Sequence, residues 1–278
     1  MGGNGEMKSS LEICLSGASL YLYPLRYTFR LAKELGFSGL ELAMGPEVRW
    51  RGGRYIRELS QKYALPVYGL HPPMFSGPQG LNLKELLPRM VHLGREMGCR
   101  MLVIHAPKVT TLEEGGLRGL EALFEARRED LLLSLENLAL FREEDRGYLL
   151  GDLYELRGFA ERHGLHLTLD TAHAGTFGYD LIEAYEILKP RLVNIHLSDL
   201  RHKKPMGGWS YSQTFFQHHQ MPGEGYLPLG ELLRRLNRDG YPGPITVEIS
   251  PFALGAWWPR KARGNLERCL AFVEGALK

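Results

Sequence analysis

The sequence predicts an α/β protein, a single-domain (β/α)8 TIM barrel, and three observations support this fold class. Short apolar segments alternate with longer amphipathic segments along the chain, which indicates repeated strand–helix units. Eight such units can be recognised, the number that closes a parallel barrel. The length of 278 residues also suits this class, because α/β barrels commonly run to about 250 residues as one domain.

Each expected strand is short, rich in Leu, Val or Ile, and closed by a polar residue or a turn signal. The expected strands are 11–15, 39–43, 66–71, 101–105, 131–136, 165–170, 192–196 and 245–249. Helices are expected at 25–35, 53–63, 82–98, 113–128, 152–163, 180–188, 228–238 and 260–276. Residues 1–10 are expected to form a disordered N-terminal tail, and residues 11–278 the barrel domain.

An open, doubly wound sheet is the alternative architecture. It would favour a Gly-rich phosphate loop after the first strand, and the segment there, Ser16-Gly17-Ala18-Ser19-Leu20, does not match G-x-G-x-x-G. The longest stretch without periodicity runs over about 200–227 and is rich in Gly, His, Gln and aromatic residues. A loop of that length is usually functional or mobile. A lid and an interface arm both fit it.

Composition excludes several classes of protein. The chain has 34 Lys and Arg against 32 Asp and Glu, so no overall field recruits nucleic acid or an acidic membrane. Three cysteines are too few and too scattered for a disulfide framework, which favours a reducing, cytoplasmic location. No run of about 18 apolar residues is present, so no membrane-spanning helix is expected.

The polar residues of the last four expected strands share one phase. Each strand carries a polar residue two positions before a potential metal ligand: Ser134/Glu136, Thr168/Asp170, Asn194/His196 and Thr246/Glu248. Successive side chains on a strand point to opposite faces, so each pair shares a face that an apolar residue does not. The apolar face packs under helices, and the polar face looks into the barrel, with the ligand-type residues at the carboxyl ends of the strands.

Three carboxylates in one lumen would be severely unfavourable without compensation. A divalent cation resolves the conflict, and Glu136, Asp170, His196 and Glu248 together suit Mn²⁺, Mg²⁺, Co²⁺ or Zn²⁺. The alternative is that each acid pairs with Arg or Lys at a strand end. The shared phase on four successive strands favours the metal site.

Three further histidines extend the same ring. His71 and His105 end the third and fourth expected strands, and His173 lies three residues beyond Asp170. A lone histidine at a strand end is more often a packing residue than a ligand. Here three converge on one barrel mouth, so contact with substrate or metal and simple packing are about equally expected.

The strand ends resemble the xylose-isomerase-like TIM barrel superfamily, over about residues 11–276. The segments that carry the resemblance are Leu-Ser-Leu-Glu136-Asn, Leu-Asp170-Thr-Ala-His173, Ile-His196-Leu-Ser-Asp199, Pro-Gly-Glu224-Gly and Val-Glu248-Ile. Their order and spacing are typical of the superfamily rather than of one member. It includes sugar and sugar phosphate isomerases and epimerases, and the endonuclease IV type of abasic-site nuclease.

The resemblance to the isomerases and epimerases implies one divalent metal ion held by Glu136, Asp170, His196 and Glu248. It implies that Glu136 and Glu248 are the catalytic pair, which moves a proton through a metal-stabilised enediolate of a sugar, sugar derivative or sugar phosphate. Contacts to that substrate are implied for His71, His105, His173, Glu41, His219 and Glu224.

The resemblance leaves two alternatives open: a related lyase or dehydratase, or a barrel that binds ligand without turnover, is one, and the endonuclease IV branch is the other. The segment from Asp170 through His173 to Gly-Tyr-Asp180 is similar to the nuclease motif, and up to three zinc ions for phosphodiester cleavage at abasic DNA sites would follow. The nuclease pattern has Asp-x-His where this chain has Gln217-His218-His219, which places the third zinc in doubt. The first expected strand also lacks the nuclease opening Gly-Ala-His-Val.

Charged and aromatic residues are expected in the loops at the catalytic mouth. Arg49, Arg51 and Arg54 follow the second strand, and Arg201, His202, Lys203 and Lys204 follow the seventh. They could meet a sugar phosphate or a DNA backbone, although duplex binding calls for a broader basic surface. The aromatic residues could stack on substrate or cover a second subunit, which makes a homo-oligomer a further expectation. They are Trp50, Trp209, Tyr211, Phe215, Phe216, Trp257 and Trp258.

Overall fold

The computed structural model describes residues 11–74, 83–110, 130–202 and 216–277. The expected tail, the expected helix over 113–128, and Lys203, Lys204, Trp209, Tyr211 and Phe215 lie outside these residues.

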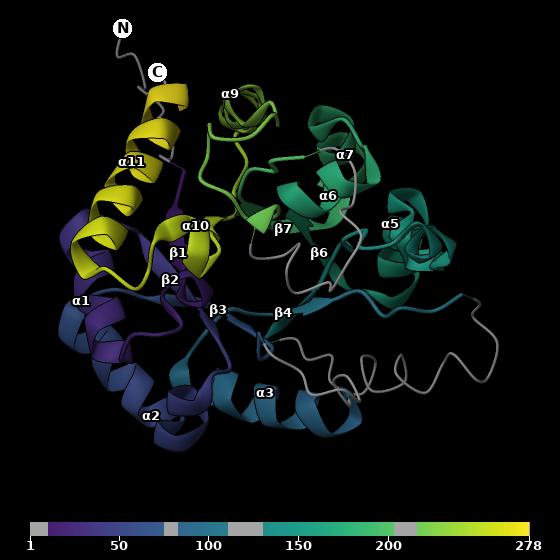
Figure 1. Ribbon diagram of the computed structural model, residues 1–278. Helices are drawn as coiled ribbons and strands as arrows, with labels where there is room; N and C mark the ends of the chain where they lie inside the picture. The colour runs from purple at the N-terminus through teal and green to yellow at the C-terminus, as the bar shows by residue number, and fades with distance from the viewer. Residues whose placement is uncertain (1–10, 75–82, 111–129, 203–215, 278) are drawn as a thin grey trace, which may run out of the picture.

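Eight parallel strands close into a barrel in chain order, β1 to β8, as the sequence predicts (Figure 1). They are β1 Ile13–Ser16, β2 Gly39–Ala43, β3 Val67–His71, β4 Met101–His105, β5 Leu132–Glu136, β6 His166–Asp170, β7 Leu192–Leu197 and β8 Ile245–Val247. The first and last strands pair in register, Cys14 opposite Thr246, and this pairing closes the sheet. The open-sheet alternative is therefore excluded.

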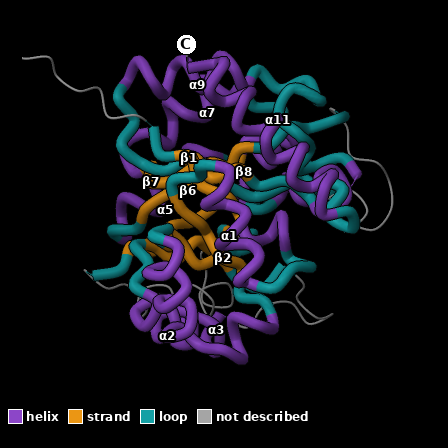
Figure 2. The backbone as a smooth tube through the Cα atoms, turned by 90° about the vertical axis from the view of Figure 1, so that its left-hand side faces the viewer, coloured by secondary structure: helices purple, strands orange, loops and turns teal. Residues whose placement is uncertain are grey.

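Helices cover the outside of the barrel, as Figures 1 and 2 show. They are α1 Leu25–Leu35, α2 Pro46–Tyr63, α3 Leu83–Met97, α5 Leu153–His163, α6 Thr171–Phe177, α7 Leu181–Leu188, α9 Leu229–Asp239, α10 Pro251–Leu254 and α11 Pro259–Leu277. Short 3-10 turns lie at Gly17–Leu20, Glu143–Gly147, Leu149–Gly151 and Lys189–Arg191. No helix among the described residues has the length and apolar character that crossing a membrane requires.

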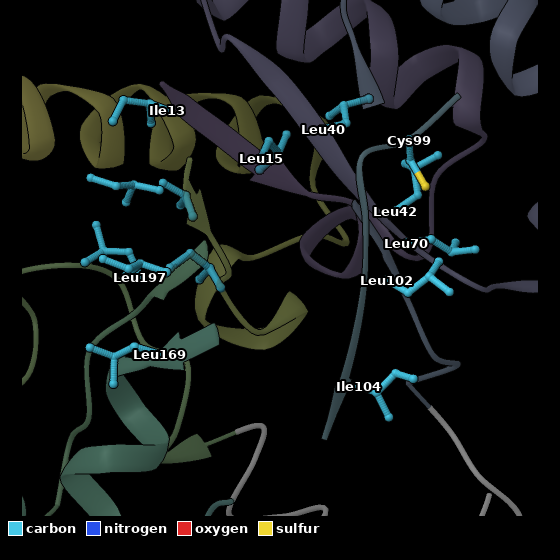
Figure 3. Packing of buried hydrophobic residues seen from close by; sticks show 14 of the residues in the cluster. Ile13, Leu15, Leu40, Leu42, Leu70, Cys99, Leu102, Ile104, Leu169 and Leu197 are labelled. Atoms are coloured by element: carbon cyan, nitrogen blue, oxygen red, sulfur yellow. The ribbon is translucent and has the colours of Figure 1, made fainter. Parts of the chain in front are cut away.

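The strand phase predicted from the sequence determines where the core lies. Leu135, Leu169, Ile195 and Val247 are fully buried and belong to the apolar layer between strands and helices. Figure 3 shows part of this layer, with Leu169 and Leu197 on neighbouring strands. Because these residues point away from the lumen, the polar residues that alternate with them point into it.

Three elements differ from the sequence-based expectation. Helix α2 begins at Pro46, seven positions before the expected start, and is interrupted at Gly52, where φ is 76° and ψ is 172°. The Gly52-Gly53 pair reads as a helix break in the sequence, yet a short helical segment, 46–51, precedes it. Helices α6 and α10 were not expected, because they have only seven and four residues and show no apolar periodicity.

Helix α2 packs closely on α3 at Gly53. A Cβ atom there would lie 2.3 Å from Glu96 Cβ and 2.8 Å from the Leu93 carbonyl oxygen. We expect Gly53→Ala to lower the free energy of unfolding by about 1–3 kcal/mol, because the helices must move apart. Urea unfolding followed by circular dichroism measures the change.

Gly264→Ala on α11 is the matched control. A Cβ at Gly264 meets no atom within 4 Å, so we expect an unchanged or slightly higher free energy of unfolding, by up to about 1 kcal/mol. Equal stabilities of the two variants would contradict the close packing at Gly53.

Candidate metal centre

Four side chains meet at the carboxyl-terminal mouth of the barrel. Glu136, Asp170 and His196 come from β5, β6 and β7, and Glu248 directly follows β8. One ligand atom from each lies within 4.8 Å of those of the other three. All four residues are buried. The structure therefore brings together the four residues that the sequence predicts as metal ligands.

His196 is at the centre of this group. Its Nδ1 lies 3.0 Å from Glu136 Oε1, 3.0 Å from Glu248 Oε2 and 3.9 Å from Asp170 Oδ2. Asp170 Oδ2 is buried and has no hydrogen-bond partner among the described residues. Its other oxygen, Oδ1, accepts a hydrogen bond from the His173 backbone N–H at 2.7 Å. A buried carboxylate oxygen without a donor, facing two other carboxylates, is what a cation site requires.

A layer of hydrogen-bonded polar side chains lies one pleat below. Ser134 Oγ and Thr168 Oγ1 are 2.7 Å apart, and Thr246 Oγ1 donates to Asn194 Oδ1 at 3.0 Å. Asn194 Nδ2 in turn donates to Glu41 Oε2 at 2.9 Å. The lower residue of each strand pair is thus hydrogen-bonded within this layer. The upper residues, the candidate ligands, do not have to supply those hydrogen bonds.

Glu41 lies beneath the ligands rather than at the open mouth. It is 1% exposed, and its Oε1 lies 2.9 Å from His196 Nε2 without the alignment of a hydrogen bond. The sequence-based expectation was a contact with substrate. In the structure Glu41 instead faces the rear nitrogen of a candidate ligand, where a carboxylate orients the imidazole ring.

The pKa values of these buried side chains depend on the opposite charges beside them. Burial by itself disfavours the charged forms, but Glu41, Glu248 and Glu136 raise the pKa of His196 well above its usual value. In the same way, His196 outweighs burial and lowers the pKa of both Glu136 and Glu248. Burial raises the pKa of Asp170. No Lys or Arg in the described part of the chain forms an ion pair with these carboxylates, so the Arg and Lys pairing considered above is not found there.

Two further groups of potential ligands adjoin the first. His71 and His105 each place Nε2 3.3 Å from Glu136 Oε2, while Glu136 Oε1 faces His196. The hydrogen bond and charge of Glu136 outweigh burial and raise the pKa of His71 to about 9. The other group is Asp170, His173 and His219, with His219 Nδ1 3.7 Å from Asp170 Oδ2. Glu136 and Asp170 are thus shared between neighbouring groups.

Two local structures position the later histidines. Asp170 caps α6, which holds His173 in the first turn with its Nδ1 3.0 Å from the Asn137 carbonyl oxygen. His219 adopts a left-handed backbone with φ 49°, uncommon for a residue other than glycine, and its Nδ1 lies 3.3 Å from Ser198 Oγ. Such strained residues cluster at functional sites.

Glu224 does not join these groups in the structure. Its carboxylate accepts a hydrogen bond from Arg268 of α11 at 2.7 Å. The Pro-Gly-Glu-Gly turn is held instead by buried Asp199, whose Oδ2 accepts from the N–H groups of Gly223 and Gly225, both at 3.0 Å. The sequence motif contains Asp199 but predicts no role for it. In the structure Asp199 holds this turn in place.

Three supporting residues were missed by the sequence analysis. Ser16 donates to Glu248 Oε1 at 3.0 Å, and Asn137 accepts from the Asp170 N–H at 2.7 Å. Ser198 contacts His219. Their positions in the sequence could have indicated two of them. Ser16 stands at the end of the first strand, and Asn137 directly follows Glu136.

Comparison with known proteins agrees with the barrel fold. The xylose isomerase-like TIM barrel family matches residues 29–269. An uncharacterised protein of Mycobacterium tuberculosis is 27% identical over 266 residues, covering 88% of this chain and 90% of that protein. Fructoselysine 3-epimerase of Escherichia coli O157:H7 is 27% identical over 282 residues, covering 90% of this chain and 94% of that enzyme.

Solved structures share the fold at lower identity. L-ribulose 3-epimerase superposes with a TM-score of 0.72 at 16% identity, covering 96% of this chain and 95% of that one. D-psicose 3-epimerase of Clostridium cellulolyticum H10 superposes with a TM-score of 0.70 at 16% identity, covering 96% and 100%. From the family match over most of its length, the chain belongs to the xylose isomerase-like TIM barrel family.

Proposed function

We propose that the protein is a divalent-metal-dependent isomerase or epimerase of a sugar or sugar derivative. The observation that carries the proposal is the buried group of Glu136, Asp170, His196 and Glu248 at the catalytic end of the barrel. The similarity to fructoselysine 3-epimerase over 90% of this chain supports the reaction class, because a 3-epimerase must remove and return a proton on carbon.

Glu136, Asp170, His196 and Glu248 would hold one Mn²⁺, Mg²⁺, Co²⁺ or Zn²⁺ ion, which would polarise the substrate carbonyl and hydroxyl oxygens. The fit rests on three carboxylates that no Lys or Arg of the described residues neutralises, and on Asp170 Oδ2, which has no hydrogen-bond partner there.

Glu136 and Glu248 are the proposed proton-transfer pair. A carboxylate beside a divalent ion stays ionised, so either glutamate could accept a proton from a carbon next to a carbonyl. One glutamate removes that proton, and the enediolate is reprotonated on the opposite face or at the adjacent carbon. Ser16 fixes Glu248 through its hydrogen bond at 3.0 Å, while His71 and His105 flank Glu136 and would orient substrate hydroxyls.

Glu248→Gln tests the proton-transfer role. An amide is a poor base, so we expect the rate of exchange of a substrate proton with solvent to fall by roughly 10²–10⁴-fold. Deuterium incorporation from D₂O into a panel of free and phosphorylated ketoses and a fructosamine, followed by NMR, measures this rate.

The matched control is Glu274→Gln, an exposed position on α11, which should keep the parent rate. Activity of Glu248→Gln within about threefold of the parent would remove Glu248 from the reaction. Absence of exchange into every sugar by the metal-loaded parent protein would count against the proposed activity itself.

Asp170→Asn tests the metal site. Asparagine keeps the helix-capping oxygen but removes one anionic ligand, so we expect metal affinity to fall by at least about tenfold without loss of the fold. Elemental analysis after dialysis gives the metal content, and circular dichroism checks the fold. Asp152→Asn, an exposed helix cap at α5, is the control. Unchanged metal content in Asp170→Asn would place Asp170 outside the ligand set.

A second candidate function is zinc-dependent cleavage of DNA at abasic sites. The observation that favours it is the presence of His71, His105 and Glu136 as one group and Asp170, His173 and His219 as another, beside the first. Neighbouring metal ions joined by shared carboxylates are suited to phosphodiester hydrolysis. Under this candidate the residues proposed above to contact sugar hydroxyls would bind metal.

Metal stoichiometry and a cleavage assay separate the two functions. The first proposal expects one tightly bound ion per chain, unchanged in His105→Ala, and no cleavage of an abasic-site duplex. Two or three ions, one of them lost in His105→Ala but not in the exposed control His92→Ala, together with cleavage abolished by a chelator, would establish the nuclease instead.

A further inference from the structure

A cleft of about 770 Å³ lies between α2 and α3, whose packing side by side is visible in Figures 1 and 2. Its floor includes buried Met44 and Leu93, and its walls include Arg49, Trp50, Arg89 and His92. This volume falls within the range of about 300–1,000 Å³ that is usual for small-molecule sites.

The cleft is separate from the metal centre. The lumen-facing residue of β2 is Glu41, so the alternation along the strand turns Leu42 and the following Met44 toward the helices. Met44 donates its backbone N–H to the His71 carbonyl oxygen at 2.8 Å, which places the ends of β2 and β3 between the cleft and the lumen.

Trp50 presents a flat aromatic surface at the cleft. It is 76% exposed, unusual for so large an apolar side chain. The Arg51 guanidinium lies 4.4 Å from the centre of its ring and 5.0 Å from that of Tyr55. Arg51 thus contacts aromatic rings on both sides of the break at Gly52. An exposed indole is suited to stacking on a planar ring.

Two arginines of the cleft have no carboxylate partner in the part of the chain that the structure describes. Neither Arg49 nor Arg89 forms an ion pair with any described acid. Glu96 contacts the cleft residue His92 at 3.7 Å and is also engaged by the Gly53 N–H at 3.2 Å and by Arg54 at 3.8 Å. Both guanidinium groups line the same cleft, and their forked donors match the oxygens of a phosphate.

We propose that the cleft between α2 and α3 binds a phosphate ester carried on a planar ring, the chemistry of a nucleotide. Arg49 and Arg89 hold the phosphate through their forked donors, and Trp50 stacks on the base. The ligand is either a free nucleotide or a nucleotide within a single strand of nucleic acid, since both present the same groups. The proposal does not depend on the reaction at the metal centre.

Isothermal titration of the full-length protein with AMP, adenosine, ribose 5-phosphate and a short single-stranded DNA tests the proposal. We expect AMP to bind more tightly than adenosine or ribose 5-phosphate, because each of these lacks one of the two recognised groups. Trp50→Ala, Arg49→Ala and Arg89→Ala should each weaken AMP binding by about tenfold.

Matched variants locate the site. Trp258→Ala, another exposed tryptophan, and Arg57→Ala, an arginine of α2 outside the cleft lining, should bind AMP like the parent. Asp170→Asn should also leave AMP binding unchanged. DNA that binds more tightly than AMP with the same dependence on Trp50 would identify a nucleic acid strand as the source, and the reverse order a free nucleotide.

Two results would overturn the proposal. The first is no binding of AMP or of DNA at millimolar concentration. The second is binding that Asp170→Asn abolishes but the three cleft variants leave unchanged, which would place the phosphate at the metal centre.

Discussion

The repulsion between buried carboxylates is the constraint on which the rest of the site depends. Glu136, Asp170 and Glu248 converge as buried side chains in the lumen, and each added negative charge makes the next less favourable. In the described part of the protein, imidazoles rather than Lys or Arg lie beside these carboxylates, above all His196. An imidazole can give up its proton and bind a metal through the freed nitrogen, which a guanidinium cannot do.

The side chains in the lumen form two layers, and the carboxylates lie in the layer at the open end of the barrel. The hydrogen bonds among Ser134, Thr168, Asn194 and Thr246 form a satisfied floor, and the ligands stand one pleat above it. Glu41 joins the two layers, and it fits only because its neighbour on β3 is Gly69, where a Cβ atom would lie 2.9 Å from Glu41 Cγ. A residue with no side chain thus makes room for the carboxylate that faces His196.

The sharing of ligands links the neighbouring groups. The two oxygens of Glu136 face different histidines, and Asp170 lies between His196 and His219. One scaffold can therefore hold a single ion, with histidines left to meet a sugar, or several ions that grip a phosphodiester. Whether one ion or several would be bound depends on how many of these imidazoles bind metal. The shared carboxylates couple the neighbouring groups to one another.

The sequence by itself determined the barrel, the boundaries of most strands and the four central residues of the candidate site, because alternation along a strand assigns each residue to a face. It did not assign Glu41 to a position behind His196 or Glu224 to a pairing with Arg268, since the partners are more than 40 residues away in the chain. The helical segment 46–51 and the cleft it forms with α3 were also decided only by the tertiary structure. A cleft between helices comes from the packing of two elements, and neither sequence alone carries that information.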